Sequence, residues 1–200
     1  AALAAAGVSL PRPGRAGFSP NEKINLGLIG CGWQGEFHLD QLLARDDVNV
    51  AAVCDCYIPR YKDFQKRAGP RCDGYQDFRR VLDRDDIDGV IIAAPDHWHG
   101  LMGIMACQAG KDAYVEKPFT LTVSEGRKLI DAARSYGRVV QVGLQQRTMP
   151  VFQHAIELAH GGELGRIVHT RGWCSPNGGI QVEQIQDPPE GLDWDLWLGP

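Results

Sequence analysis

A glycine-rich turn follows the first apolar stretch of the chain. The sequence INLGLIGCGWQG, which starts at Ile24, ends in the pattern G-x-G-x-x-G. Glycine weakens regular structure unless the backbone needs a positive φ or another group must come very close to it. A pyrophosphate is such a group, because the N–H groups and the positive dipole end of a following helix attract it. The expected phosphate-binding residues are Gly30, Gly32, Trp33, Gln34 and Gly35.

An acid stands where a dinucleotide site needs one. Asp55 directly follows the second apolar run, Val48–Cys54, and lies twenty residues after Gly35. A carboxylate at that place accepts hydrogen bonds from the adenosine ribose hydroxyls, and it repels a 2′-phosphate. The expected cofactor is therefore NAD, with NADP disfavoured but left open by the nearby Arg60. A methyltransferase that uses S-adenosylmethionine is the alternative from another class, although Ile24–Ile29 lacks the acid that commonly precedes its glycines.

Two further apolar runs end in polar residues. The stretch PDHWHG, which begins at Pro95, follows GVIIAA, and the triplet EKP around Lys117 follows DAYV. The carboxyl ends of parallel strands face one crevice, so both stretches are expected beside the glycines. The Lys117 ammonium can hydrogen-bond an alcohol oxygen and exchange its proton as hydride leaves. A surface lysine and a helix-capping His99 are the plainer alternatives. His97 and His99 would point about 200° apart on a helix, so no metal site is expected.

Strand and helix patterns alternate along most of the chain. This alternation predicts βαβ crossovers, and the continuously apolar strands indicate a parallel sheet covered on both faces. We therefore expect an α/β fold with a doubly wound Rossmann sheet over residues 21–146. The predicted strands are Ile24–Ile29, Val48–Cys54, Gly89–Ala94, Ala113–Val115 and Val139–Leu144. The predicted helices are Trp33–Arg45, Pro59–Ala68, Phe78–Leu82, His99–Ala109 and Ser124–Tyr136, the last capped by Thr122 or Ser124. Beyond them, Val151–His160 predicts a helix and Ile167–Trp173 a strand.

The composition is that of an ordinary globular chain. Of 200 residues, 44% are hydrophobic and 23% charged, and the formal net charge of −4 offers no basic field for nucleic acid. No apolar run approaches the roughly 18 residues that span a bilayer. Residues 1–20 are rich in Ala, Pro and Gly and contain no acid. They are expected to be the remnant of an export signal or, if the protein is cytoplasmic, a disordered leader. The six cysteines are expected to be packing or surface thiols.

At this point the chain resembles a known family. GLIGCGWQG, Asp55, AAPDHWH and VEKPF, in that order, resemble the Gfo/Idh/MocA oxidoreductases from about residue 23 to residue 146, and more loosely to residue 200. The resemblance implies that residues 147–200 begin a second α/β domain with a mainly antiparallel sheet, incomplete here. It also implies that Lys117 handles the proton. The further cofactor-binding residues that we expect are Pro95, His99 on the nicotinamide side, Glu116 at the strand end, and Gln145.

The resemblance also sets the expected activity. It implies an NAD(P)-dependent oxidoreductase that acts on a hydroxyl of a sugar or cyclitol, and we expect a homo-oligomer at full length. The family's catalytic pair, spaced D-x-x-x-H, does not occur after Gln146, so we expect a C-terminally truncated chain. A glycosidase that oxidises and then re-reduces one sugar on bound NAD is an alternative of the same fold. A non-catalytic NAD-binding module is another.

Overall fold

The structure is a computed structural model that describes residues 23–173 and 186–200. The chain divides into two units. The first comprises the residues up to Gly143 together with Glu190–Pro200, and the second comprises Leu144–Pro189. The expected leader and Cys174 lie outside the described residues.

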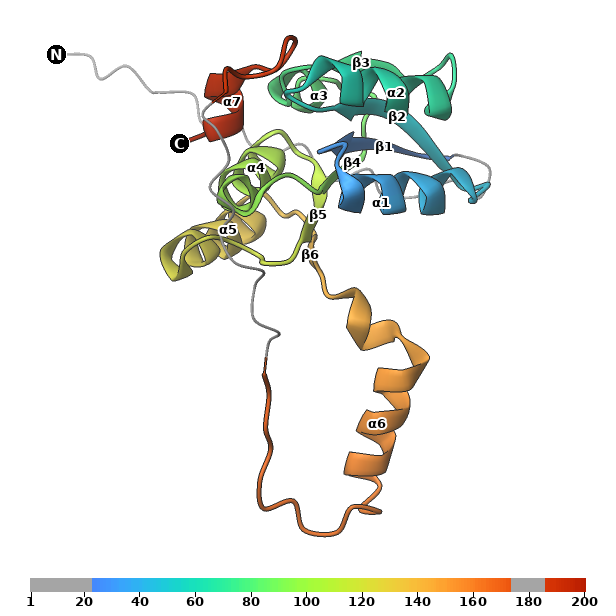
Figure 1. Cartoon of the computed structure of the whole chain (residues 1–200), viewed down its shortest axis with the longest axis vertical. Coiled ribbons are helices and arrows are strands. Elements are labelled where there is room, and N and C mark those ends of the chain that lie inside the picture. The colour runs from blue at the N-terminus through green and yellow to red at the C-terminus, as the bar shows by residue number, and fades with distance from the viewer. Residues whose placement is uncertain (1–22, 174–185) are drawn as a thin grey trace, which may run out of the picture. The chain divides into compact units, whose positions relative to one another are not determined.

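The first unit is built on one parallel sheet of six strands, in the order β3-β2-β1-β4-β5-β6 (Figure 1). This order is that of the doubly wound dinucleotide-binding fold, which confirms the predicted fold class. The strands are β1 (Ile24–Ile29), β2 (Val48–Cys54), β3 (Asp73–Tyr75), β4 (Gly89–Ile92), β5 (Asp112–Glu116) and β6 (Val140–Gly143). The helices are α1 (Trp33–Leu43), α2 (Ile58–Ala68), α3 (Arg79–Leu82), α4 (Asp96–Gln108), α5 (Val123–Ser135) and, after the second unit, α7 (Trp194–Leu198).

Both faces of the sheet are covered, as its continuously apolar strands require. On one face, Leu39 of α1 and Phe64 of α2 pack with Leu28 and Val53 of the strands. On the other face, the core cluster joins residues of α3 and α4, among them Val81, Trp98 and Met102, to Ile29 and Ile92. The carboxyl ends of β1, β2 and β4 are thereby fixed side by side.

Several boundaries differ from the predicted ones. Helix α4 begins at Asp96, three residues before the predicted start, so His97 and His99 both lie on it. Thr122 caps α5, where its hydroxyl accepts a hydrogen bond from Glu125 N at 3.3 Å. Strand β3 was not predicted.

The second unit contains a short 3-10 helix, η1 (Gln145–Thr148), and α6 (Pro150–His160). The predicted strand at Ile167–Trp173 is wrong, because these residues have no strand structure. A strand needs a partner that accepts its backbone hydrogen bonds, and no described residue pairs with this segment. The expected division of the chain at Gln146 stays a prediction.

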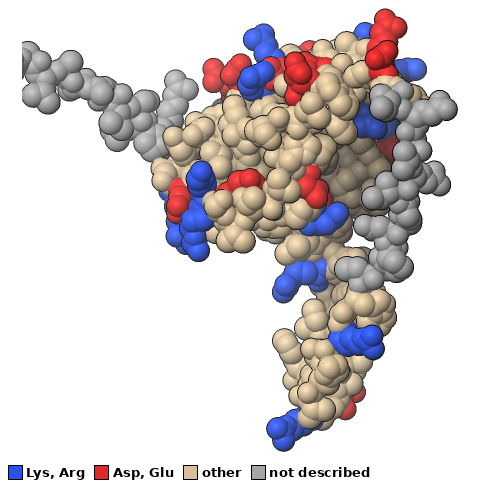
Figure 2. Space-filling view, turned by 60° about the vertical axis from the view of Figure 1, so that its left-hand side comes forward, with Lys and Arg blue, Asp and Glu red and all other residues tan. Residues whose placement is uncertain are grey.

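Charged side chains of both signs are interspersed on the face of the molecule that Figure 2 shows. In the part of the chain that the structure describes, every helix is too short or too polar to cross a membrane.

Candidate functional site: the glycine turn and the neighbouring strand ends

Two of the three glycines are required by the protein's own backbone. Gly30 has a φ of +97°, and a Cβ there would lie 2.5 Å from the backbone of Ala93. A Cβ at Gly35 would collide with the carbonyl oxygen of Gly30, so this glycine lets α1 start close against the strand. These are the roles expected of the first and third glycines of the motif.

Gly32 is different, because no described residue lies close enough to demand a glycine there. Its φ of −86° and ψ of −167° are open to any residue. A Cβ at this position would meet only one atom within 4 Å, Arg60 Nη1 at 3.9 Å. Neither the backbone nor the packing explains the glycine, so the free space over Gly32 is the part of the turn that fits a ligand.

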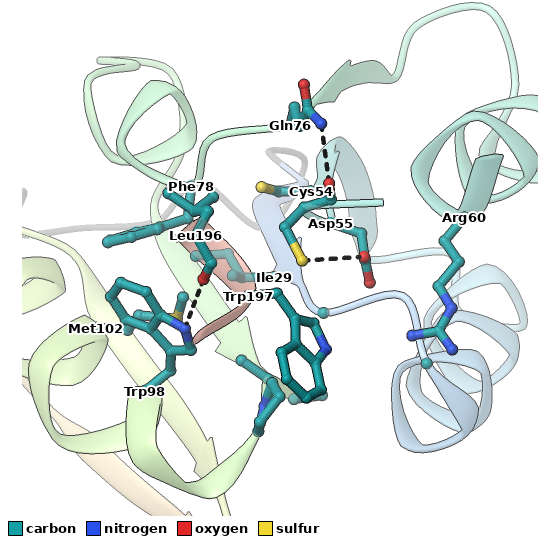
Figure 3. A pocket seen from close by; sticks show the side chains of 16 residues that line it. Ile29, Cys54, Asp55, Arg60, Gln76, Phe78, Trp98, Met102, Leu196 and Trp197 are labelled. Carbon is teal, nitrogen blue, oxygen red and sulfur yellow. Dashed lines mark hydrogen bonds between the residues drawn. The ribbon is translucent and has the colours of Figure 1, made fainter. Parts of the chain in front are cut away.

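A pocket of about 260 Å³ opens beside this turn (Figure 3). Of the residues predicted to bind the cofactor, Gly30, Gly32, Asp55 and Pro95 line it. Its volume is slightly below the range of about 300–1,000 Å³ typical of small-molecule sites. The pocket therefore suits one end of a dinucleotide better than the whole of it.

Asp55 lies at the end of β2, is 9% exposed and lines the pocket. Its Oδ2 accepts a hydrogen bond from Cys31 N at 2.8 Å, and its Oδ1 accepts one from Tyr57 N at 2.9 Å. The carboxylate thus ties the glycine turn to the turn before α2. The Cys56 thiol is a third, weaker donor, with its Sγ 3.9 Å from Asp55 Oδ1. An ionised carboxylate has about four acceptor positions, so one remains open to a ribose hydroxyl.

Arg60 is the cation of the pocket. It is exposed on α2, and its guanidinium lies near the open space over Gly32. Within residues 23–173 and 186–200, this guanidinium has no hydrogen-bond or ion-pair partner, whereas Arg67 of the same helix binds Glu36 and Asp40. An unpaired guanidinium beside an open pocket fits an anionic ligand.

The thiols near Asp55 are held in the neutral form. Burial, with the Asp55 charge second, raises the pKa of Cys31, and the same causes raise the pKa of Cys54. Cys56, which lines the pocket, has its pKa raised to about 11, again by burial first and Asp55 second. The five described cysteines are free, and Cys31, Cys54, Cys72 and Cys107 are buried, as expected of packing thiols.

The end of β5 is organised by Glu116, which is 3% exposed. Its Oε1 accepts a hydrogen bond from Gln34 Nε2 at 2.8 Å and lies 2.8 Å from His38 Nε2. Its Oε2 accepts one from Lys117 N at 3.1 Å. Glu116 thus joins α1 to the strand end that carries Lys117. Gln34 and Glu116, which were both expected to bind the cofactor, are hydrogen-bonded to each other.

His99 is buried at 1% exposure and bridges two loops. Its Nδ1 lies 2.5 Å from the carbonyl oxygen of Pro118, and its Nε2 lies 2.7 Å from that of Ala94. These contacts support a role in positioning the two strand ends. The role of His99 at a nicotinamide stays a prediction.

The remaining candidates are more exposed. The Lys117 side chain is exposed, and among the described residues its ammonium has no hydrogen-bond or ion-pair partner. Trp33 is 84% exposed at the start of α1. Gln145 belongs to the second unit, so its predicted place near the nicotinamide stays a prediction. No group of three or more metal-ligating side chains occurs in the described ranges.

Sequence reasoning missed most of the apolar side of the pocket. Phe78, Trp98 and Met102 line it, as do Leu196 and Trp197 of α7. The buried Phe78 and Trp98 contact each other edge to face, with ring centroids 5.4 Å apart. The signal for α7 is the pair of tryptophans in DWDLW, which are three residues apart and so share one face of a helix. His38, which contacts Glu116, was also missed; it follows Gly35 by three residues on α1.

Comparison with known proteins identifies the family. Residues 24–144 match GFO_IDH_MocA, described as "Oxidoreductase family, NAD-binding Rossmann fold". The chain belongs to the Gfo/Idh/MocA family. The match covers both the glycine turn and Lys117, and it favours an oxidoreductase over the methyltransferase alternative.

Curated relatives that resemble the chain include glycoside hydrolases. The chain is 38% identical over 120 residues to an alpha-N-acetylgalactosaminidase from Shewanella oneidensis, which is 56% of this chain and 26% of that protein. It is 35% identical over 160 residues to glycosyl hydrolase family 109 protein 1 from Shewanella sp. strain ANA-3, which is 70% of this chain and 34% of that protein. The chain therefore spans a quarter to a third of the length of these relatives.

Solved structures that resemble the chain include dehydrogenases. Myo-inositol 2-dehydrogenase from Lactobacillus plantarum has a TM-score of 0.69 at 25% identity, over 74% of this chain and 44% of that one. The WlbA dehydrogenase from Chromobacterium violaceum, in complex with NADH and UDP-GlcNAcA, has a TM-score of 0.69 at 26% identity, over 74% of this chain and 43% of that one.

Proposed function

We propose that the protein binds NAD across the glycine turn and transfers hydride between this cofactor and a hydroxyl-bearing carbon of a sugar or cyclitol. The observation that carries the proposal is the open space over Gly32, where neither backbone nor packing requires a glycine. Asp55 and Arg60, which line the same pocket, add a ribose acceptor and a cation for phosphate. The family assignment supports the same reading.

NAD is the proposed cofactor rather than NADP. The Asp55 carboxylate keeps an acceptor position for a ribose hydroxyl, and its charge opposes a 2′-phosphate. Arg60 lies over the second glycine, where its guanidinium complements the pyrophosphate that both cofactors share. Calorimetric titration of both cofactors tests this preference, and tighter binding of NADP would contradict it.

Lys117 is the proposed acid–base residue. Bound NAD would supply the acceptor or donor of the hydride that leaves or reaches the substrate carbon. The Lys117 amine takes the hydroxyl proton in the oxidation direction, and its ammonium returns that proton in reduction. Glu116 holds the backbone at Lys117 through the Lys117 N–H, and His99 fixes the following loop through the Pro118 carbonyl. In this reading both residues position the lysine.

Substitution of the lysine tests this role in the full-length protein. Lys117→Met keeps the length of the side chain and removes its charge. We expect kcat to fall by about 10²–10⁴-fold, the usual contribution of a general acid–base group, while NAD affinity changes little. Lys128→Met, on an exposed face of α5, is the control and should leave kcat unchanged. An unchanged kcat in Lys117→Met would assign the proton transfer to another group.

The second candidate is an NAD-dependent glycosidase, and the two curated Shewanella relatives favour it. In that reaction the sugar is oxidised and later re-reduced, so NAD is regenerated and no net NADH accumulates. The full-length protein is therefore incubated with NAD and either free sugars and cyclitols or a nitrophenyl α-N-acetylgalactosaminide. Net NADH supports the dehydrogenase. Release of nitrophenol without net NADH supports the glycosidase, and NAD binding with neither product leaves a binding module.

A further inference from the structure

The segment 190–200 returns to the first unit after the second one. Its start is fixed to the turn between β2 and α2 by backbone hydrogen bonds. Ile58 N donates to Gly191 O at 3.0 Å, and Asp193 N donates to Cys56 O at 2.9 Å. This contact places the segment directly beside Asp55, at the edge of the pocket.

Helix α7 is also attached to α4 on the opposite side. Trp98 Nε1 donates a hydrogen bond to the Leu196 carbonyl oxygen at 3.0 Å, and His97 Nε2 lies 3.1 Å from the Trp197 carbonyl oxygen. Gly199 has a φ of +74°, and a Cβ there would lie 2.9 Å from Trp98 Nε1. The chain therefore needs a glycine at this position both for its backbone conformation and for its close approach to α4.

This double attachment brings the Trp197 indole into the pocket lining. In the view of Figure 3, the indole lies between Trp98 and Arg60. It stacks on Trp194 with ring centroids 4.9 Å apart and an interplanar angle of 10°. Trp197 is nevertheless 41% exposed. A large aromatic face that is both supported from behind and open to a pocket is suited to stack against a flat ligand group.

The other residues of the pocket indicate which ligand group that is. The space over Gly32 and the Asp55 carboxylate suit a pyrophosphate and the adjacent ribose. The apolar remainder of the lining includes Phe78, Met102 and Leu196. An uncharged purine is the part of the dinucleotide that matches such a lining.

We propose that α7 forms a wall of the cofactor site and that the Trp197 indole packs against the adenine of NAD. This inference rests on the proposed function. The wall is supplied by a segment that follows the second unit, so the pocket is complete only when residues 190–200 are docked on the first unit. Trp197 is thus a cofactor-binding residue outside the span that matches the family, residues 24–144.

The test is calorimetric titration of NAD and of ADP-ribose, which lacks the nicotinamide, into the 200-residue chain and three variants. Stacking of a base on an aromatic side chain predicts that Trp197→Ala binds NAD about 5- to 100-fold more weakly. ADP-ribose should lose affinity by the same factor, because the contact is with the adenosine end. Trp197→Phe keeps an aromatic face and should bind within about threefold of wild type. Trp173→Ala, in the second unit and 80% exposed, is the matched control.

The outcomes separate this inference from the proposed function. If the wild-type chain binds neither ligand, the proposed function and the inference fall together. If wild type binds and Trp197→Ala binds equally well, the inference alone is wrong. Tighter binding by Trp197→Ala would also overturn it, since the indole would then occupy the place of the adenine. If Trp197→Ala loses affinity for NAD but not for ADP-ribose, the indole contacts the nicotinamide end instead, and the inference is wrong. Circular dichroism of each variant checks that the sheet is intact.

Discussion

The glycine turn and the carboxyl end of β5 both carry polar residues that the sequence marks as functional, but the structure uses them differently. Beside the turn, the space over Gly32 is open, and the Arg60 guanidinium has no partner among the described residues. At the end of β5, Glu116 has three donors around it, and both ring nitrogens of His99 face carbonyl oxygens.

The residues beside the glycine turn are available to a ligand, whereas Glu116 and His99 bind other groups of the protein and fix the local structure. Buried polar groups are hydrogen-bonded because an unpaired one is costly. Glu116 and His99 follow that rule within the protein, whereas the exposed Lys117 ammonium has no hydrogen-bond or ion-pair partner in the part of the chain that the structure describes. The groups near Gly32 leave room for a partner that residues 23–173 and 186–200 do not supply. Substitutions beside the turn should therefore weaken cofactor binding, and substitutions at the end of β5 should lower stability.

The largest expected effect is loss of cofactor binding at the glycine turn. Gly32→Val places a branched side chain in the space proposed for the pyrophosphate, so NAD affinity should fall by more than about 100-fold. Stability should be unaffected, because the Cβ itself meets only the mobile end of Arg60. Gly172→Val, at another glycine with open surroundings, is the control for both calorimetry and thermal unfolding. Unchanged NAD affinity in Gly32→Val would mean that the turn does not hold phosphates.

The next effect is on stability, at the end of β5. Glu116→Ala removes the acceptor for Gln34, His38 and the Lys117 N–H. Loss of these hydrogen bonds to a buried, charged acceptor should lower the free energy of unfolding by about 2 kcal/mol, measured by urea denaturation. Glu116→Gln, which keeps one acceptor oxygen, should recover part of that loss. A Glu116→Ala variant as stable as wild type would show that this network is not what holds the strand end.

A smaller effect is expected at Arg60. Arg60→Ala removes an exposed cation beside the proposed pyrophosphate, and NAD affinity should fall by roughly 5- to 10-fold. Lys62→Ala removes a charge from the same helix outside the pocket lining and is the matched control. NADP should be affected to a similar degree. If only NADP binding weakens, Arg60 contacts a 2′-phosphate instead.

The smallest effect concerns the Cys56 thiol in the pocket lining. Its pKa is raised to about 11, so at about pH 8 roughly one thiol in a thousand is the reactive thiolate. Alkylation by iodoacetamide should therefore be slow and should accelerate about tenfold for each pH unit until the pH approaches the pKa. Saturating NAD should slow it severalfold, as read by peptide mass spectrometry. Alkylation at the same rate with and without NAD would place the cofactor away from Cys56.

The sequence was most informative where short-range pattern and burial coincide. β1 and β2 have the predicted bounds, because each is a mainly apolar run that ends at a turn or an acid. β3, Asp73–Tyr75, is three residues long and has no such pattern; its strand structure comes from pairing with β2. The predicted strand at Ile167–Trp173 shows the converse, since a favourable pattern without a partner strand forms no strand.

The candidate site shows the same contrast between residues set by short-range pattern and residues set by distant contacts. Gly30, Gly32 and Asp55 were predicted from spacing alone, and all three line the pocket. Trp197 was not predicted, because the residues that hold α7, such as Trp98, lie about a hundred positions earlier in the chain. A contact at that separation leaves no periodicity in a single sequence, whereas a turn between a strand and its helix does.

In the proposed function, the pocket beside the glycine turn holds the adenosine end of NAD. Saturation-transfer difference NMR on NAD in the presence of the chain tests this claim. Protons of the ligand that contact the protein most closely receive the most saturation. The adenine and adenosine-ribose protons should therefore receive more saturation than the nicotinamide protons, and the signal should vanish in Gly32→Val. Stronger saturation of the nicotinamide than of the adenine, or a signal that Gly32→Val leaves intact, would contradict the claim.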